Sequence, residues 1–486
     1  MSWTALAPCA RTIPIWARRS ARRIQPCVGL CRGGRGDLGA SCSAGDRGAR
    51  VREPRTISRT THVMSEAFAR FPAALRLPRL QSRGAQQAAE APSDQLLEQR
   101  HARSLAGTLA HPLVGGNQVD VLVDGPSTYR AMFAAIAVAR DHINLESYIL
   151  EHEGPGEPLA ELLLQKRAAG VNVNVIFDGF GSMRTPAEYF ARLRRAGVAL
   201  CEYNPVSLWK RPLHRALHLR DHRKLLVVDG SIGFVGGINF SSVYASGSGN
   251  KRRSVETKPW RDIHVRVEGP VVAQLQEIFL AHWKCQMGTT PTSARYYPAL
   301  HAHGSARLGV AACEAGRRRN PFYSSLLAAI ENADRRVFVT TAYFVPPRRL
   351  LRALERAARR GVDVRLLLPG ISDSWPALAA GRSFYGRLLH AGVRIHECHD
   401  AILHAKTAVI DTVWSTVGSS NMDWRSLLHN AEVNLVGLER PLATDLERVY
   451  FEDLARSREV TLEQWRRRSW LHRLTEWAAR KVEFFL

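Results

Sequence analysis

The sequence predicts an α/β protein made of two homologous domains. Three features support this prediction: a motif that occurs twice, an alternation of helices and strands that repeats around each copy, and a length of 486 residues. A chain of this length has room for two or three domains with a large core. The repeat period of about 190 residues indicates two homologous domains, because solenoid repeats are only about 20 to 50 residues long.

The motif that occurs twice is His-x-Lys, followed by Asp, Gly and Asn. The first copy, RDHRKLLVVDGSIGFVGGIN, spans 220–239, and the second, HAKTAVIDTVWSTVGSSN, spans 404–421. The runs LLVV and TAVI predict buried strands. Side chains two residues apart on a strand face the same way, so each His is expected beside its Lys. The motif residues are His222, Lys224, Asp229, Gly237, Asn239, His404, Lys406, Asp411, Ser419 and Asn421.

Helices and strands alternate in the same order in both halves. Each half contains a helix leading into a strand, then a helix, a glycine and a second strand, then a third such unit. This alternation predicts a sheet with helices on both faces. The paired segments are 128–150 with 323–345, 162–179 with 353–370, and 194–204 with 389–399.

Two inserts distinguish the first half. The insert 206–219 mixes Trp and Leu with Lys and Arg, and it fits either a solvated loop or a loop that faces the substrate or a membrane. The insert 244–259 is basic and rich in Gly and Ser. We expect it to be mobile and to flank the mouth of the site.

The ends of the chain differ in composition from the two halves. Residues 1–63 hold twelve Arg against three acidic residues and no apolar periodicity, so we expect disorder there. A transit peptide and a translation start at Met64 both stay open. At the other end, apolar residues at helical spacing between many Arg predict a basic amphipathic helix, for core packing or for membrane binding. The expected domains are 1–110 (extension and helical lead-in), 111–290, 291–455 and 456–486.

The formal net charge of +24 suits either nucleic acid or an anionic membrane surface. No apolar run reaches the length of a membrane span. The eight cysteines are scattered, which favours reduced thiols. Neither Cys27 with Cys31 nor His301 with His303 has the further ligands of a metal site, so we expect no metal.

The duplicated motif resembles the HKD motif of the phospholipase D superfamily. Within that superfamily, WRDIHV at 260–265 and GSSNMDWRSLLHNAEVNL at 418–435 look like bacterial cardiolipin synthases. The resemblance runs from about Gln118 to about Asp453. It implies two phospholipase D-like α/β/α sandwich domains packed as a pseudo-twofold pair.

The motif residues suit phosphodiester chemistry. One His attacks phosphorus while the other protonates the leaving alkoxide, and two Lys and two Asn stabilise the phosphate oxygens. We therefore expect His222, Lys224, Asn239, His404, Lys406 and Asn421 to converge. The resemblance makes His222 the nucleophile and His404 the general acid and base, an order that trapping the intermediate would test.

The resemblance also implies residues that orient the histidines. Each His is expected to be held by a carboxylate downstream of its own motif, which pairs His222 with Asp262 and His404 with Glu432. Asp229 and Asp411, although part of the catalytic motif, are expected to be structural. Gly237 is expected to allow close approach to the opposite half, and Ser419 to bind phosphate or to pack. Glu146 is a further candidate for the site.

The resemblance implies phosphatidyl transfer between two phosphatidylglycerol molecules, giving cardiolipin and glycerol through a phosphohistidine, without a cofactor. The alternative is a phospholipase D or an HKD nuclease that hydrolyses phosphodiesters. The basic stretches lack an array of stacking aromatic residues, so no nucleic acid is expected. A non-catalytic membrane-binding protein is disfavoured because both motifs are intact. The expected partner is a phosphatidylglycerol-rich membrane, at the cytoplasmic side of a bacterial inner membrane.

Overall fold

The computed structural model describes residues 93–206, 218–248, 258–291, 295–317 and 319–481. All of them belong to one unit, Ala88–Leu486. The expectations for residues 1–92, for most of the insert 206–219, for residues 249–257 of the second insert and for the last five residues lie outside the described parts.

Two series of elements follow each other along the chain, preceded by α2 (Asp94–Leu105). The first half contains β1 (Val114–Val123), α3 (Asp124–Ala137), β2 (His142–Ser147), α4 (Gly156–Ala168), β3 (Asn172–Asp178), α5 (Ala187–Arg195), β4 (Ala199–Tyr203), β5 (Lys224–Val228), β6 (Ile232–Gly236), the 3-10 helix η3 (Ser242–Tyr244), β7 (Trp260–Arg261), β8 (Ile263–Glu268) and α6 (Val271–Met287). The second half contains β9 (Ala306–Cys313), α7 (Pro321–Glu331), β10 (Arg336–Thr340), β11 (Phe344–Val345), α8 (Arg348–Arg359), β12 (Asp363–Pro369), α9 (Trp375–Arg382), α10 (Tyr385–His390), β13 (Arg394–Cys398), β14 (Ile402–Leu403), β15 (Thr407–Ile410), β16 (Trp414–Gly418), β17 (Met422–Asp423), α11 (Trp424–Leu428), β18 (Glu432–Leu438) and α12 (Arg440–Leu454).

The strand order confirms the predicted pair of homologous α/β domains. The first half runs β4-β3-β2-β5-β6-β8-β1, and the second half runs β13-β12-β10-β15-β16-β18-β9. Each strand therefore has a counterpart at the same place in the other half, as a pseudo-twofold pair requires. The β2, β3 and β4 strands are parallel, whereas β5, β6, β8 and β1 are antiparallel to their neighbours.

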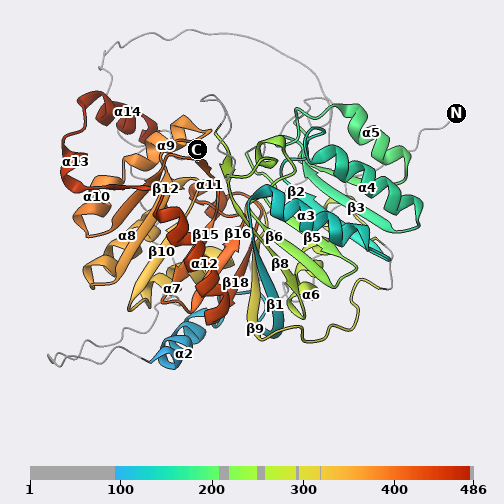
Figure 1. Ribbon diagram of the computed structural model, residues 1–486, viewed down its shortest axis with the longest axis horizontal. Coiled ribbons are helices and arrows are strands. Elements are labelled where there is room, and N and C mark those ends of the chain that lie inside the picture. The colour runs from blue at the N-terminus through green and yellow to red at the C-terminus, as the bar shows by residue number, and fades with distance from the viewer. Residues whose placement is uncertain (1–92, 207–217, 249–257, 292–294, 318, 482–486) are drawn as a thin grey trace, which may run out of the picture. The chain divides into compact units, whose positions relative to one another are not determined.

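The two halves share one continuous sheet of fifteen strands because β1 pairs with β9. These two strands lie side by side at the centre of the molecule in Figure 1. No strand was expected in either segment. In β1, Val119, Val121 and Val123 alternate with other residues and pack on the shared core, a signal that could have identified this strand. In β9, alanine and glycine blur the alternation.

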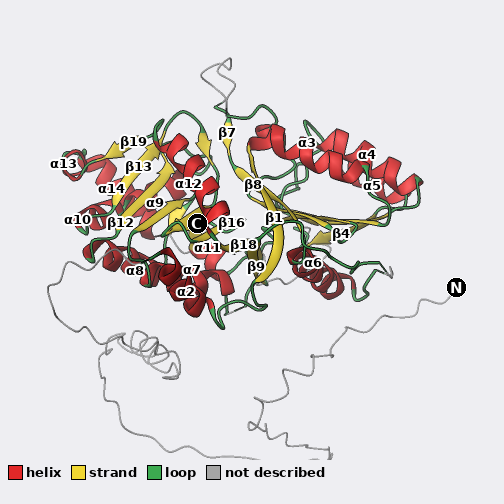
Figure 2. Ribbon diagram, turned by 60° about the horizontal axis from the view of Figure 1, so that its bottom comes forward, coloured by secondary structure: helices red, strands yellow, loops and turns green. Residues whose placement is uncertain are grey.

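Helices cover both faces of this sheet, as predicted. In the first half, α3, α4 and α5 lie on one face and α6 on the other (Figure 2). In the second half, α7 and α8 lie on the face opposite α12. One apolar core joins α6 and α12 to strands of both halves, including Val265 and Leu435. The shared core and the shared sheet make the interface between the halves part of the fold itself.

The two motif strands, β5 and β15, are buried along their whole length. Each ends at its motif aspartate, which has a positive φ: 50° at Asp229 and 54° at Asp411. Asp229 accepts backbone N–H groups of residues 140–142, and Asp411 accepts those of residues 334–336. The aspartates therefore join the motif strand to the start of its neighbour, β2 or β10, at the end remote from the histidine.

The chain beyond α12 differs from the single helix expected over 456–486. It first adds β19 (Arg458–Val460) to the sheet edge beside β13, then forms α13 (Leu462–Arg466) and α14 (Trp470–Lys481). A capping box between Thr461 and Gln464 starts α13 and separates it from the strand. Only the last of these elements carries the amphipathic stripe.

Candidate active site

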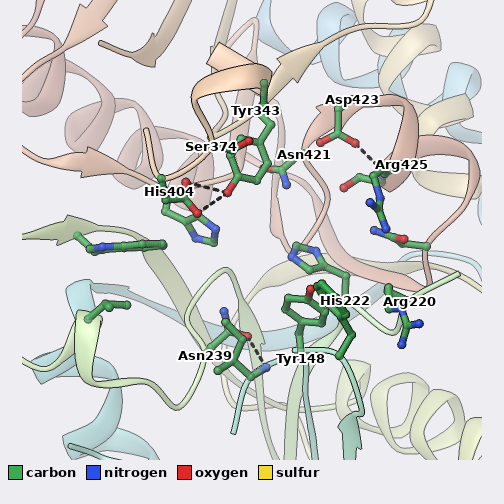
Figure 3. Close-up of a pocket in the computed structure, with 18 of the residues that line it drawn as sticks. Tyr148, Arg220, His222, Asn239, Tyr343, Ser374, His404, Asn421, Asp423 and Arg425 are labelled. Atoms are coloured by element: carbon green, nitrogen blue, oxygen red, sulfur yellow. Dashed lines mark hydrogen bonds between the residues drawn. The ribbon is translucent and has the colours of Figure 1, made fainter. Parts of the chain in front are cut away.

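A pocket of about 360 Å³ lies between the two halves, and both motifs contribute to its wall. Of the motif residues, His222, Asn239, His404 and Asn421 line it. Figure 3 shows the two imidazoles on facing sides of this space. The expectation that both motifs meet in a single composite site therefore agrees with the geometry of these four side chains.

The backbone in front of each histidine pairs with the other half. Asp221 forms a parallel bridge with Ala431, and the amide of His222 donates to the carbonyl of Ala431 at 2.9 Å. In the other motif, β14 pairs with β7, and the amide of His404 donates to the carbonyl of Arg261 at 2.7 Å. His222 is thus held against Ala431, which directly precedes Glu432. His404 is held against Arg261, which directly precedes Asp262.

This crossing corrects the expected pairing of the carboxylates. Nδ1 of His222 lies 3.1 Å from Oε1 of Glu432, and Nδ1 of His404 lies 2.6 Å from Oδ2 of Asp262. Both acids were expected to hold a histidine, but each was assigned to the motif of its own half. The sequence offered only distance along the chain, whereas the exchanged strand pairs place each acid beside the histidine of the other half.

Ser419 and Gly237 support the two carboxylates. The hydroxyl of Ser419 donates to Glu432, so this side chain orients an acid and packs within its own half. A Cβ atom on Gly237 would lie 2.2 Å from Oδ1 of Asp262. The close approach expected at Gly237 therefore exists, but it is to a residue of the same half and not to the opposite half. Side chains larger than hydrogen at this position would displace Asp262.

Burial shifts the ionisation of the groups around both histidines. It lowers the pKa of His222 well below its usual range, helped by the charge of Lys224, and it also lowers that of His404. Burial raises the pKa of Glu432 to about 8. It lowers the pKa of Lys224 to about 7 and that of Lys406 to about 8. The imidazoles are therefore neutral at neutral pH, as nucleophilic attack requires.

The motif lysines lie against the histidines and not on the pocket wall. The ammonium of Lys224 donates to the carbonyl of His222 at 2.7 Å. The ammonium of Lys406 donates to the carbonyl of His404 and lies 2.8 Å from its Nδ1. Both charges are fully enclosed, which strengthens their action on a phosphate in the pocket.

The two asparagines differ in their contacts. Oδ1 of Asn239 accepts the backbone N–H of Ile149 at 3.2 Å, and its Nδ2 donates to the hydroxyl of Tyr244. Within the described part of the chain, Oδ1 of Asn421 has no hydrogen-bond partner. Asn421 is nearly inaccessible, with 2% of its surface exposed, so its amide is available mainly to a molecule in the pocket.

Several residues on the pocket wall were not identified from the sequence. The hydroxyl of Tyr244 lies 3.0 Å from Nδ1 of His404, and Tyr148 packs edge-on against His222 with ring centroids 5.0 Å apart. Near His404, the hydroxyl of Tyr343 donates to Asp373. Tyr148 and Tyr343 hold the same position in the paired segments 128–150 and 323–345, and Tyr343 lies edge-on to His404 as Tyr148 does to His222. This repetition could have identified both tyrosines from the sequence. The wall also carries Arg220, which stands in the first motif stretch, and Arg425, which stands in the stretch 418–435 that carries the family resemblance.

Other candidates from the sequence do not line the pocket. Asp229 and Asp411, grouped with the catalytic residues, are the strand-end caps described above. The carboxylate of Glu146 accepts from Nδ1 of His282 at 2.7 Å, and both side chains are buried. His301 and His303 are exposed. Among the described residues, the cluster with metal-ligand spacing is Glu146, Asp221 and His282, where the guanidinium of Arg223 already lies 3.5 Å from Glu146.

Comparisons of sequence agree with this geometry. The family described as "Cardiolipin synthase, PLD-like domain" matches residues 132–283 and 326–454. A cardiolipin synthase of Alkalihalophilus pseudofirmus is 33% identical over 395 residues, which cover 80% of this chain and 77% of that protein. A cardiolipin synthase A of Pseudomonas putida is 35% identical over 376 residues, covering 76% of each chain.

Comparison of structures supports the fold. A phosphatidylserine synthase of Haemophilus influenzae superposes with a TM-score of 0.59 at 13% identity, covering 80% of this chain and all of that one. At this identity the likeness concerns the fold alone. The two family matches together span both HKD motifs and more than half of the sequence. The chain therefore belongs to the family of phospholipase D-like cardiolipin synthases.

Proposed function

We propose that this phosphatidyltransferase is a cardiolipin synthase, which converts two phosphatidylglycerol molecules into cardiolipin and glycerol. One observation carries the proposal: two imidazoles from different halves line one pocket, each held through Nδ1 by a buried carboxylate. A carboxylate that accepts from Nδ1 leaves Nε2 for the substrate. Two such histidines can exchange one alcohol for another at phosphorus without a cofactor.

In the first step, Nε2 of His222 attacks the phosphorus of the first phosphatidylglycerol. The bond from phosphorus to the headgroup glycerol breaks as the N–P bond forms, and the departing oxygen takes a proton from His404. The negative charge of the bound phosphodiester raises the pKa of His404, which favours its protonated form for this step. Glycerol leaves, and the phosphatidyl group stays on His222.

In the second step, a headgroup hydroxyl of another phosphatidylglycerol gives its proton to His404 and attacks phosphorus. The N–P bond breaks, and both histidines return to their starting state. Lys224, Lys406, Asn239 and Asn421 stabilise the phosphate oxygens in both steps, since enclosed charges and dipoles act strongly where charge develops.

The test is to incubate the purified full chain with vesicles of labelled phosphatidylglycerol and to identify the products. Cardiolipin and glycerol in equal amounts are expected. Phosphatidic acid as the main product would replace the proposal with a phospholipase D, in which water is the acceptor. Cleavage of an oligonucleotide at a comparable rate would favour an HKD nuclease.

The value of kcat/KM, which reports on the free enzyme, is expected to follow a narrow bell-shaped curve against pH. Glu432, with a pKa raised to about 8, is protonated as the pH falls and then no longer accepts from His222, so activity is lost on the acid side. Lys224 and Lys406, with pKa values lowered to about 7 and about 8, lose their charges as the pH rises, which weakens phosphate binding. The value of kcat/KM should therefore be greatest between about pH 7 and 8.

The pH profile of kcat distinguishes the loss of activity at high pH, caused by the lysines, from the loss at low pH, caused by Glu432. Bound phosphodiester raises the pKa of both lysines, so kcat should persist to higher pH than kcat/KM. Measuring both quantities from about pH 5.5 to 9.5 is the experiment. A value of kcat/KM that stays constant from about pH 6 to 9 would contradict the assignment of these groups.

The apolar face of α14 supports the proposed partner, an anionic membrane surface. The side chains of Trp470, Leu471, Leu474 and Trp477 are between 51% and 69% exposed, so α14 does not bury this stripe in the core. The exposed basic residues of α13 and α14 suit anionic phospholipid. α14 packs on α9, whose residue Ala377 lines the pocket. The lipid-facing helix therefore lies one helix away from the catalytic histidines.

None of the helices in the described residues has the length and apolar composition of a membrane span.

We propose that the enzyme is peripheral and works from the cytoplasmic side of a bacterial inner membrane. Anionic lipid of that leaflet attracts basic segments with about 1 kcal/mol per side chain near the surface. Cys201, Cys313 and Cys398 are buried free thiols, a state typical of proteins in a reducing compartment.

Replacing Trp470 and Trp477 together with alanine is expected to weaken binding to phosphatidylglycerol vesicles by about 10-fold or more, because each indole buries a large apolar area on insertion. Activity on detergent-dispersed substrate should change little. Tyr297, which is 55% exposed on a loop, gives the matched control Tyr297→Ala. Equal vesicle binding by the double variant and the parent chain, measured by flotation, would exclude α14 as the membrane contact.

A further inference from the structure

Cardiolipin formation requires two phosphates in the pocket at once. One is the reacting phosphorus on His222, and the other belongs to the lipid whose headgroup hydroxyl attacks. The motif residues account for the first phosphate only. Resting on the proposed function, we propose that Arg220 and Arg425 bind the second phosphate, that of the acceptor lipid, and so select an acceptor that carries a phosphodiester.

The two arginines come from different halves and meet on the same side of the pocket. Arg220 precedes His222 in the segment that pairs with Ala431, and Arg425 lies in the first turn of α11. Both line the pocket. In Figure 3 they lie on the side of His222 away from His404. The donor phosphate is held between the two histidines. The two arginines can therefore bind a neighbouring group instead.

Both guanidinium groups act electrostatically on the tyrosine that packs on His222. Burial and the charge of Asp178 raise the pKa of the Tyr148 hydroxyl to about 12, and the charges of Arg425 and Arg220 oppose this rise. Tyr148 is the ring that packs on His222. Both charges therefore act on the side of the nucleophile that Tyr148 occupies.

Neighbouring groups fix the two arginines and offset only part of their positive charge. Arg220 donates to the carbonyl of Asn204 at 2.8 Å, stacks over Phe180 and lies 3.5 Å from the buried carboxylate of Asp178. Arg425 donates to the carbonyl of His218 at 3.1 Å and makes no ion pair with a carboxylate of the described residues. Burial raises the pKa of Asp423 on this wall to about 7 and also raises the pKa of Asp178 beneath Arg220. These acids therefore offset the two positive charges only partly at neutral pH.

The opposite end of the pocket has the opposite charge. Asp373 lies there, accepts the hydroxyl of Tyr343 at 2.8 Å and acts electrostatically on His404. A phosphate would be repelled by this carboxylate, whereas the hydroxyls of the departing glycerol can donate to it. The second phosphate therefore fits at the arginine end, where a guanidinium can form two parallel hydrogen bonds with phosphate oxygens.

The dimensions of the product agree with this assignment. In cardiolipin, a single glycerol joins the two phosphates, so both lie within the reach of one three-carbon bridge. A cavity of about 360 Å³ has room for two phosphates and this bridge but not for acyl chains, which must stay outside. The acceptor phosphate must consequently bind inside the pocket next to the donor phosphate.

The test compares two acceptors in one reaction. Purified full-length protein is incubated with phosphatidylglycerol vesicles and ethanol, and cardiolipin, phosphatidylethanol and phosphatidic acid are quantified. In Arg425→Gln, the ratio of cardiolipin to phosphatidylethanol is expected to fall about 10- to 100-fold, the size of effect for losing a charge-assisted contact. Arg425→Lys should recover part of the ratio, since it keeps the charge but not the fork of donors.

The matched control is Arg359→Gln, which removes the same charge from an exposed position on α8 and should leave the ratio unchanged. Arg220→Lys repeats the test from the other half while keeping a cation at a buried position. An unchanged ratio in both Arg425→Gln and Arg220→Lys would overturn the inference, as would an equal loss of both products. A parent chain that forms phosphatidylethanol but no cardiolipin would instead refute the proposed function.

Discussion

Replacing His222 with alanine is expected to abolish cardiolipin formation, with a loss of at least about 10⁴-fold in kcat. His222 is the proposed covalent nucleophile, and no other described side chain can take its place with the same orientation. The exposed His301 supplies the control His301→Ala, which should keep the parent activity. Product formation from labelled phosphatidylglycerol measures the effect.

A substrate with a good leaving group separates the two histidines. Phosphatidyl-p-nitrophenol needs no proton on its leaving oxygen, so His404→Ala should still release p-nitrophenol and accumulate a phosphatidyl-enzyme. His222→Ala should do neither. Mapping the label in the His404→Ala protein identifies the nucleophile directly. Release of p-nitrophenol by His222→Ala, with the label on His404 in the parent enzyme, would reverse the two roles.

The second large effect is expected at the crossed carboxylates. Glu432→Gln replaces an acceptor beside Nδ1 of His222 with an amide that can donate, which favours the wrong tautomer of the nucleophile. Loss of a histidine-orienting carboxylate costs about 10⁴-fold in a comparable arrangement. We expect Glu432→Gln to slow p-nitrophenol release by about 10² to 10⁴-fold.

Asp262→Asn should give the complementary pattern because Asp262 orients His404. With phosphatidyl-p-nitrophenol, this variant should release the leaving group at close to the parent rate, whereas with phosphatidylglycerol it should be severely slowed. Pairing within each half would give the reverse result, with Asp262→Asn blocking p-nitrophenol release. Thermal unfolding of both variants distinguishes these outcomes from loss of the fold, and Glu314→Gln is a control at a carboxylate that contacts Arg223 rather than a histidine.

Most of the fold could be predicted from the sequence because periodicity and repetition are local signals. The buried runs around Lys224 and Lys406 formed strands, and the paired helix–strand units formed the equivalent parts of the two halves. The junction of the halves through β1 and β9 could not be predicted in this way. Strand pairing between segments nearly 190 residues apart depends on the register of the whole sheet, which no local pattern encodes.

The same distinction between local and long-range signals applies to the residues of the candidate site. Residues that occur in both motifs were found because repetition marks them, and Asp262 and Glu432 were found through the family resemblance. Their partners were exchanged, since pairing depends on which backbone segments cross between the halves. Tyr244, Asp373 and Arg425 were missed because each occurs once. A side chain without a counterpart becomes a candidate only after folding brings it to the pocket.

The unequal surroundings of the two histidines have a consequence for how such an enzyme evolves. If two identical chains with one motif each assembled this pocket, any side chain beside one imidazole would also stand beside the other. Here Tyr244 contacts His404, and Ser419 donates to the acid that holds His222, whereas the first motif has Gly237 at the position of Ser419. Covalent fusion of the halves lets mutation change one side of the pocket alone. The two ends of the cavity thereby become different. Two chemically identical lipids then react as donor or as acceptor according to the end at which each one binds.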